Sequence, residues 1–175
     1  MRKSVLLMIL LFAVGMTASA QKFALIDMEY ILKNIPAYER ANEQLNQVSK
    51  KWQSEVEKVA EEAKTLYKNY QSEAVFLSEE QKGKKEEAIV AKEKEAAELR
   101  RTYFGPEGEL FKKRESLMQP IQDEIYNAVK EISEQKGYSV VVDRASATSI
   151  IFASPRIDIS NEAVSYTHLR AHETP

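Results

Sequence analysis

Two histidines near the end of the chain are of a type and spacing that could bind a metal ion. His168 and His172 lie four residues apart, which would place both imidazoles on one face of a helix. No pattern of carboxylates accompanies them, and the surrounding segment departs from the pattern of the rest of the chain. We therefore predict that the protein has no metal site.

Three aspartates lie close to the ends of predicted strands, at Asp27, Asp143 and Asp158. Paired carboxylates can act as general acid and base, but no histidine, nucleophile or glycine-rich phosphate-binding loop accompanies these three. We expect them to cap backbone groups or form ion pairs. The chain has no cysteine, which excludes disulfides and thiol nucleophiles. The sequence thus predicts a protein that is not an enzyme and has no cofactor.

The charged residues are numerous and nearly balanced. Lys and Arg number 25 and Asp and Glu 27, which gives a formal net charge of −2. Neutralising the phosphates of a nucleic acid requires an excess of positive charge. We therefore predict no nucleic-acid partner.

The first 20 residues are predicted to be a secretory signal peptide. Arg2 and Lys3 precede an apolar run at 5–14, which is shorter than the roughly 20 residues that a bilayer-spanning helix needs. Residues 18–20 form a small-x-small cleavage site, so we expect cleavage after Ala20 and export from the cytoplasm. No later stretch is long and apolar enough to span a membrane, so we expect at most peripheral membrane contact.

Residues 36–136, which we call the arm, are predicted to form a long antiparallel helical hairpin. Apolar or small residues recur about every 3.6 residues in its first half, so they share one helix face. A narrow stripe of this kind suits one partner helix rather than a globular core. A capping box from Ser78 to Gln81 marks the start of the second helix and places the tip near 75–80. The first stripe consists of Tyr38, Ala41, Leu45, Val48, Trp52, Val56, Val59, Ala63, Leu66 and Tyr70, and the second of Ala96, Leu99, Tyr103, Leu110, Leu117, Ile121, Ile125, Ala128 and Ile132.

The returning half of the arm has two predicted interruptions. Gly105–Gly108 contains two glycines and a proline, and Pro120 removes a backbone donor and crowds the preceding turn. We expect kinks or brief breaks at both places.

The segments on either side of the arm, 21–35 and 137–163, are predicted to form a small β-rich body. Strands are expected at 22–28, 138–143 and 149–153, with Gly137 ending the preceding helix. Three short strands bury little surface by themselves, so the sheet predicts self-association. Its apolar residues are Phe23, Leu25, Ile26, Val140, Val141, Val142, Ile150, Ile151 and Phe152.

A short final helix is expected to start at 158–162. Residues 164–175 abandon the amphipathic pattern expected of that helix. We interpret them as an atypical tail, of the kind produced by translated cloning or adapter sequence. The predicted fold class is therefore mainly α, with a helical hairpin on a short-stranded sheet.

In their order and spacing, these features resemble the Skp (OmpH-like) family of periplasmic chaperones. The resemblance implies a homotrimer in which the strands of three subunits build a barrel-like body, and three arms project around a cavity. It also implies a periplasmic holdase that binds unfolded outer-membrane proteins without ATP. The resemblance covers about residues 22–163, and the residues that carry it are 23–32, 111–115, 118–121, 136–138, 140–143, 150–153 and 158–161.

The arm departs from the best-known members of the family in its charge. Those members are strongly basic, whereas residues 36–136 carry 18 Lys and Arg against 21 Asp and Glu. Simple electrostatic capture of acidic clients is therefore not expected.

Several aromatic and apolar residues of the arm are candidates for client contact. We expect Trp52, Tyr70 and Tyr103 to fill the seam between the helices. Tyr67 and Phe104 lie beside the stripe and are predicted to contact clients. At the tip, Val75, Phe76 and Leu77 either pack the turn or contact clients, and exposed apolar residues there favour a use. An alternative function is an exported coiled-coil adaptor that binds one folded envelope partner.

Overall fold

The structure is a computed structural model that describes residues 21–147 and 149–173. The chain divides into two compact units. One is Leu32–Tyr126, and the other combines the described residues up to Ile31 with the described residues from Asn127 onward. The predicted signal peptide, residues 1–20, lies outside the described residues. The chain is mostly helical with one small sheet, which confirms the predicted fold class.

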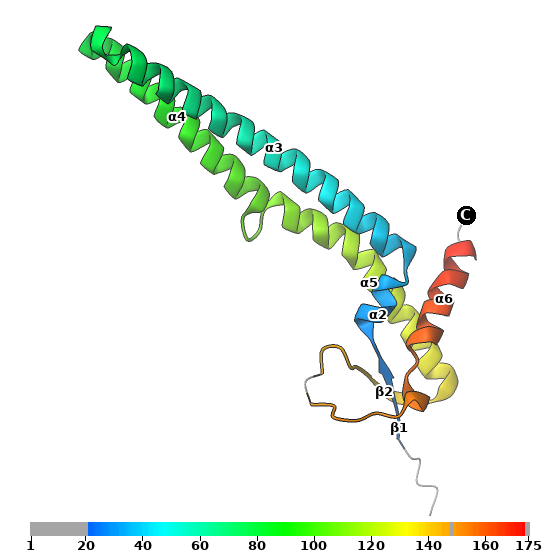
Figure 1. The fold of residues 1–175 in the computed structure, drawn as a ribbon. Helices are drawn as coiled ribbons and strands as arrows, with labels where there is room; N and C mark the ends of the chain where they lie inside the picture. Colours follow the sequence, from blue (N-terminus) through cyan, green and yellow to red (C-terminus); the bar gives the residue numbers. More distant parts are fainter. Residues whose placement is uncertain (1–20, 148, 174–175) are drawn as a thin grey trace, which may run out of the picture. The chain divides into compact units, whose positions relative to one another are not determined.

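A hairpin of two long helices dominates the first unit (Figure 1). Helix α3 (Pro36–Glu73) leads to the short 3-10 helix η1 (Ala74–Phe76), and α4 (Glu79–Phe104) returns beside α3. A proline at the first helical position costs α3 nothing, because that N–H has no acceptor within a helix.

The predicted stripe on α3 is its buried face. Ala41, Leu45, Val56 and Ala63 are buried, and Leu66 is 38% exposed. The remaining stripe residues of α3 are half-buried. The second stripe is half-buried from Ala96 to Leu117 and buried from Ile121 to Ile132. The helical periodicity therefore identified most of the residues that hold the hairpin together, but it missed Ile89, the buried residue of α4.

The capping box at the start of α4 has the geometry that the sequence predicts. The Gln81 N–H donates to the Ser78 hydroxyl over 3.3 Å, and the Ser78 N–H donates to the Gln81 side-chain oxygen over 3.0 Å. These two bonds satisfy donors that a helix start otherwise leaves free, so the turn at the tip is well defined.

A four-residue break separates α4 from α5 (Glu109–Lys136), as the glycines at 105–108 predict. Gly108 is buried, and a Cβ there would lie 2.8 Å from the carbonyl oxygens of both Thr102 and Tyr103. At Pro120, by contrast, α5 continues without a break, so that expected interruption is absent. Both Ser116 and Pro120 are exposed, so water can reach the carbonyl that loses its helical partner.

The sheet of the second unit pairs strands from the two ends of the chain. Strands β1 (Lys22–Ile26) and β2 (Tyr138–Asp143) are parallel, with Leu25 opposite Val142. A parallel pair needs a long crossover, and here the crossover is the whole arm. Gly137, with φ of 70°, ends α5 immediately before β2, where a left-handed conformation favours glycine.

The predicted third strand at 149–153 is wrong, because the described residues form a two-stranded sheet. The free side of β1 instead bridges Asp158, and the Ile159 N–H donates to the Leu25 carbonyl over 2.9 Å. Ile150, Ile151 and Phe152 favour a strand by type, but a strand also needs a neighbouring edge. Within the described part of this single chain, that segment pairs with neither strand.

The remaining elements are α2 (Met28–Lys33), η2 (Pro155–Ile157) and α6 (Ser160–Glu173). The final helix starts where the sequence predicts, but it does not stop at Ala163. It continues through most of the segment interpreted as an atypical tail, and Thr167 within it is buried. That segment has no helix breaker before Pro175, which explains why α6 extends this far. The buried apolar residues of the second unit are Ala24, Leu25, Ile26, Ile31, Ala128, Ile132, Ile159 and Ala163.

Candidate functional site

The tip of the hairpin presents apolar side chains to solvent. Val75 and Phe76 are each 86% exposed, whereas Leu77 is half-buried. The sequence left open whether these three residues pack the turn or contact clients. Leu77 packs partly against the turn, whereas Val75 and Phe76 do not. Large side chains this exposed gain nothing from folding.

The charges around the tip are largely paired. Lys82 pairs with Glu79 and Lys84 with Glu80, each over 2.7 Å. Lys85 pairs with Glu73 across the turn, so it links α4 to α3. The tip therefore offers apolar surface rather than an uncompensated charge.

Three aromatic residues predicted for the seam lie there. Trp52 and Tyr103 stack, and the Tyr103 hydroxyl donates to Glu55 over 2.7 Å. The Tyr70 hydroxyl donates to Glu86 on the opposite helix. The hydrogen bond to Glu55, burial and the negative charge of that carboxylate together raise the pKa of Tyr103 above its usual value. These contacts stabilise the packing of α3 against α4.

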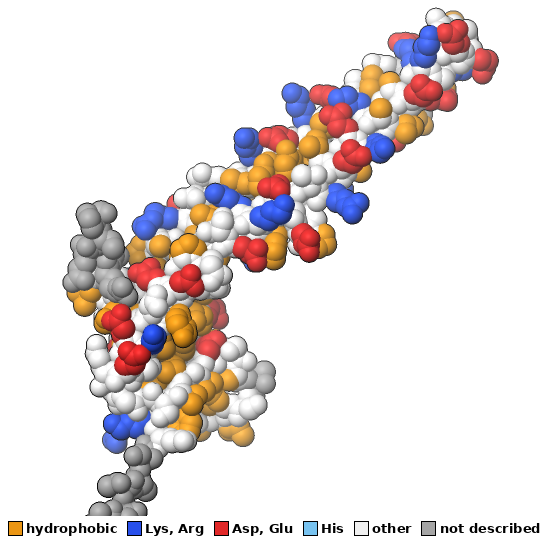
Figure 2. Space-filling view, turned by 180° about the vertical axis from the view of Figure 1, so that it is seen from behind, with side chains coloured by type: hydrophobic (Ala, Val, Ile, Leu, Met, Phe, Trp, Pro, Cys, Tyr) orange, Lys and Arg blue, Asp and Glu red, His pale blue; other side chains and the backbone are white. Residues whose placement is uncertain are grey.

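Two open grooves lie along the hairpin, and the predicted contact residues Tyr67 and Phe104 line one each. Figure 2 shows hydrophobic side chains gathered along the hairpin between charged ones. Tyr67 is 50% exposed and Phe104 38% exposed. We call the first the upper groove, of about 420 Å³, and the second the mid-arm groove, of about 330 Å³. The upper groove includes Ala60, Ala63, Tyr67, Ala96 and Arg100, and the mid-arm groove includes Leu45, Phe104, Pro106, Leu110, Phe111 and Arg114.

The structure does not bring all the predicted contact residues together. Val75 and Phe76 belong to the tip turn, whereas Tyr67 and Phe104 belong to separate grooves. The sequence also missed Arg100 and Arg114 as groove residues. Their position one helical turn from the stripe, beside aromatic residues, is the signal that could have identified them.

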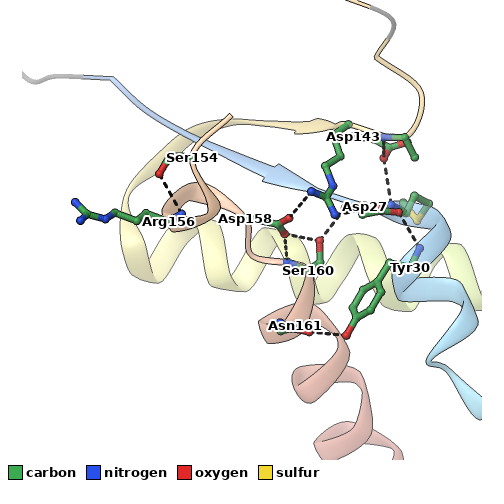
Figure 3. A network of polar contacts seen from close by, with 11 residues as sticks. Asp27, Tyr30, Asp143, Ser154, Arg156, Asp158, Ser160 and Asn161 are labelled. Carbon is green, nitrogen blue, oxygen red and sulfur yellow. Dashed lines mark hydrogen bonds and ion pairs between the residues drawn. The ribbon is translucent and has the colours of Figure 1, made fainter. Parts of the chain in front are cut away.

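The three aspartates form a polar network in the second unit (Figure 3). Arg144 pairs with Asp27 over 3.1 Å and with Asp158 over 3.3 Å. Asp158 also accepts from the hydroxyl and the N–H of Ser160, at the start of α6. The Ser160 hydroxyl in turn accepts from the Asp27 N–H over 2.8 Å. The network joins the ends of both strands to α6.

Hydrogen bonds set the ionisation of two of these aspartates. Burial alone raises the pKa of Asp143, but bonds from the N–H groups of Met28 and Ala145 and from Ser146 outweigh it, so the pKa lies below its usual value. For Asp158, burial is likewise outweighed by Ser160 and by the charge of Arg144, so its pKa is also lowered. Capping and ion pairing, predicted for these residues, are confirmed.

The residues predicted for the subunit-contact body divide into buried and exposed groups. Leu25 and Ile26 are buried, and Val141 and Val142 are half-buried. Exposed members of the set are Phe23 at 51%, Val140 at 45%, Ile150 at 37%, Ile151 at 102% and Phe152 at 86%. The exposed group gives the second unit an apolar surface.

The histidine pair gives no support to a metal site. His168 is exposed on α6, and the side chain of His172 lies outside the described ones. Among the described residues, no three His, Cys, Asp or Glu side chains are grouped closely enough to hold a metal ion. No helix in the described part of the chain is long and apolar enough to cross a membrane.

A solved structure and a family model are similar to this chain. No curated protein matches the sequence. A crystal structure from Caulobacter crescentus CB15, described as an outer membrane chaperone (OmpH-like), matches with a TM-score of 0.72 at 11% identity, over 86% of this chain and 85% of that one. This likeness shows a shared fold. A family model described as "Outer membrane protein (OmpH-like)" matches residues 22–166. The hairpin, the parallel strand pair and this match together show that the chain belongs to the OmpH-like family.

Proposed function

We propose that the protein is an ATP-independent periplasmic holdase chaperone that binds unfolded outer-membrane proteins and prevents their aggregation. The observation that carries this proposal is the exposure of Val75 and Phe76 at the tip, next to the capping box that starts α4. The chaperone description of the Caulobacter crescentus protein supports it.

The apolar surfaces of the hairpin suit many weak contacts with an unfolded chain. Open grooves and a two-residue apolar tip each bury far less than a full side-chain pocket, so each contact contributes well under about 2 kcal/mol. Several such contacts on linked arms reinforce one another through effective concentration. No step in this mechanism requires nucleotide.

We further propose that three subunits assemble through the second unit, and that their arms enclose a cavity for the client. The exposed Ile151, Phe152 and Val140 support this assembly, because an apolar surface beside an open strand edge favours association. Subunit association also brings several weak binding surfaces together.

The test is light scattering of an unfolded β-barrel outer-membrane protein diluted out of denaturant, with the purified protein present and ATP absent. We expect suppression of aggregation that weakens several-fold in the double variant Val75→Ser/Phe76→Ser. The matched control is Val90→Ser, which removes a 60% exposed apolar side chain from the middle of α4.

Absence of suppression at a molar excess of trimer would refute the holdase. The protein could instead bind one folded envelope protein and lose that binding on a single substitution. That result would favour the adaptor function over the holdase function, because binding to one folded partner concentrates in hot spots.

A further inference from the structure

The upper groove and the mid-arm groove lie on the same flank of the hairpin. Ser49 lines the mid-arm groove and Tyr67 the upper groove, and they are 18 residues apart, which is five turns of α3. On α4, Arg100 of the upper groove and Phe104 of the mid-arm groove are one turn apart. The flank is therefore one continuous surface with two depressions.

Each groove combines an apolar floor with an arginine. Within the described residues, Arg100 and Arg114 make no ion pair or hydrogen bond, whereas Lys64, Lys85 and Lys92 all have carboxylate partners. An arginine next to aromatic rings can bind a carboxylate through two parallel N–H bonds. The guanidinium groups are thus available to a ligand.

Acidic residues are scarce in these linings, although the arm as a whole has more acidic than basic residues. The lining of the mid-arm groove contains no Asp or Glu. Asn46 and Ser49 lie on its edge, and their side chains can hydrogen-bond a peptide backbone. The upper groove contains one acidic residue, Glu93, so the mid-arm groove is the more selective for an anion.

We propose that this flank binds extended polypeptide segments in which an aromatic or aliphatic side chain is followed by a carboxylate, one such pair in each groove. The inference rests on the proposed holdase function and names the client segments that the arm selects. The ring or alkyl group lies on the apolar floor, and the carboxylate meets Arg100 or Arg114. Because the surrounding surface repels acidic segments, only a carboxylate beside an apolar residue binds well.

The distance between the grooves sets the spacing of the pairs. Asn46 and Ala63 are 17 residues apart on α3, which corresponds to about 26 Å along the helix axis. An extended chain rises about 3.3 Å per residue. Pairs about eight residues apart in a client would therefore fill both grooves at once.

The test uses fluorescent peptides and the full protein, with binding measured by anisotropy. The lead peptide carries two Phe-Asp pairs eight residues apart. Comparison peptides replace Asp with Asn or Lys, or place the pairs four residues apart. We expect the lead peptide to bind about tenfold more tightly than the Lys peptide, because each Lys replaces an attraction to an arginine by a repulsion. We expect it to bind several-fold more tightly than the Asn and short-spacing peptides, which lose one or both charge contacts.

Adjacent residues provide matched variants. Arg114→Gln and Arg100→Gln should each weaken binding of the lead peptide about threefold. Each should also reduce the difference in affinity between the lead peptide and the Asn peptide. Lys113→Gln and Arg101→Gln remove the same charge one position away, outside both groove linings, and should change affinity less than twofold. Equal effects of Arg114→Gln and Lys113→Gln would show a non-specific field and overturn the proposal.

The same proteins in the aggregation assay separate the two proposals. If wild-type protein suppresses aggregation but binds the Asp, Asn and Lys peptides equally, the segment preference is wrong and the holdase function stands. If it neither suppresses aggregation nor binds any peptide, both proposals fail. Suppression with the expected peptide ranking supports both.

Discussion

Trp52 of α3 and Tyr103 of α4 stack with their ring centroids 4.9 Å apart and their planes within 5° of parallel. Tyr103 also meets Phe104 edge-on at 6.4 Å, and Phe104 lines the mid-arm groove. The rings that fasten the hairpin are therefore in direct contact with a surface proposed to bind clients.

Replacing Tyr103 by Leu should destabilise the protein by about 1–2 kcal/mol, since it removes the stack and the hydrogen bond to Glu55. Urea unfolding followed by fluorescence measures this, because Trp52 is the sole tryptophan of the chain. Trp52→Leu and the double variant, followed by circular dichroism, complete a double-mutant cycle. A coupling energy near zero would mean that the two rings do not stabilise each other.

The glycines of α4 and of the following break should respond oppositely to alanine. Gly108→Ala should destabilise by about 1–3 kcal/mol, because the new Cβ meets backbone oxygens that cannot move without distorting the turn. Gly83→Ala should stabilise by up to about 1 kcal/mol, because the site is open and lies within α4. Thermal unfolding of both variants measures the contrast, and a stable Gly108→Ala variant would contradict the close packing.

Acid should weaken the second unit through Asp143 and Asp158. Their pKa values are lower in the folded protein than the usual 3.8, so the unfolded chain binds more protons as the pH falls. Their contribution to stability is therefore complete above about pH 4 and is lost as the pH falls through the folded pKa values. Urea unfolding free energies between pH 7 and pH 3 measure this loss.

Three variants test whether Asp143 and Asp158 cause the loss of stability in acid. Asp143→Asn and Asp158→Asn should lower stability at pH 7 and show a shallower loss in acid than the wild type. Arg144→Gln should act in the same direction, because the Arg144 charge helps to lower the pKa of Asp158. An unchanged acid slope in all three would place the acid sensitivity elsewhere.

Subunit assembly should depend on the segment that does not pair within one chain. If the subunits form the proposed trimer, Ile151→Asp/Phe152→Asp should shift the mass measured by light scattering towards the monomer, because charge at an apolar contact is costly to bury. Leu169→Asp, at a 65% exposed position on α6, is the control and should leave the mass unchanged. A trimer that survives the double substitution would exclude this segment from the interface.

The sequence by itself determined the parts that depend on neighbours close in the chain. The spacing of the apolar stripes indicated the hairpin. Ser78 and Gln81 indicated the start of α4, and Gly137 indicated the end of α5. These features were predictable because helices, caps and helix ends depend on bonds between residues at most a few positions apart. The seam positions of Trp52 and Tyr103 followed from the same periodicity.

Only the tertiary structure decided what is paired over long distances. It set β1 parallel to β2, bridged β1 to Asp158 where a third strand was expected, and linked Arg144 to Asp27 across 117 residues. It also brought Arg114 to the groove that Phe104 and Leu45 line. Residue types give the capacity for such contacts, but strand pairing and salt bridges need a partner whose position follows from the folding of the entire intervening chain.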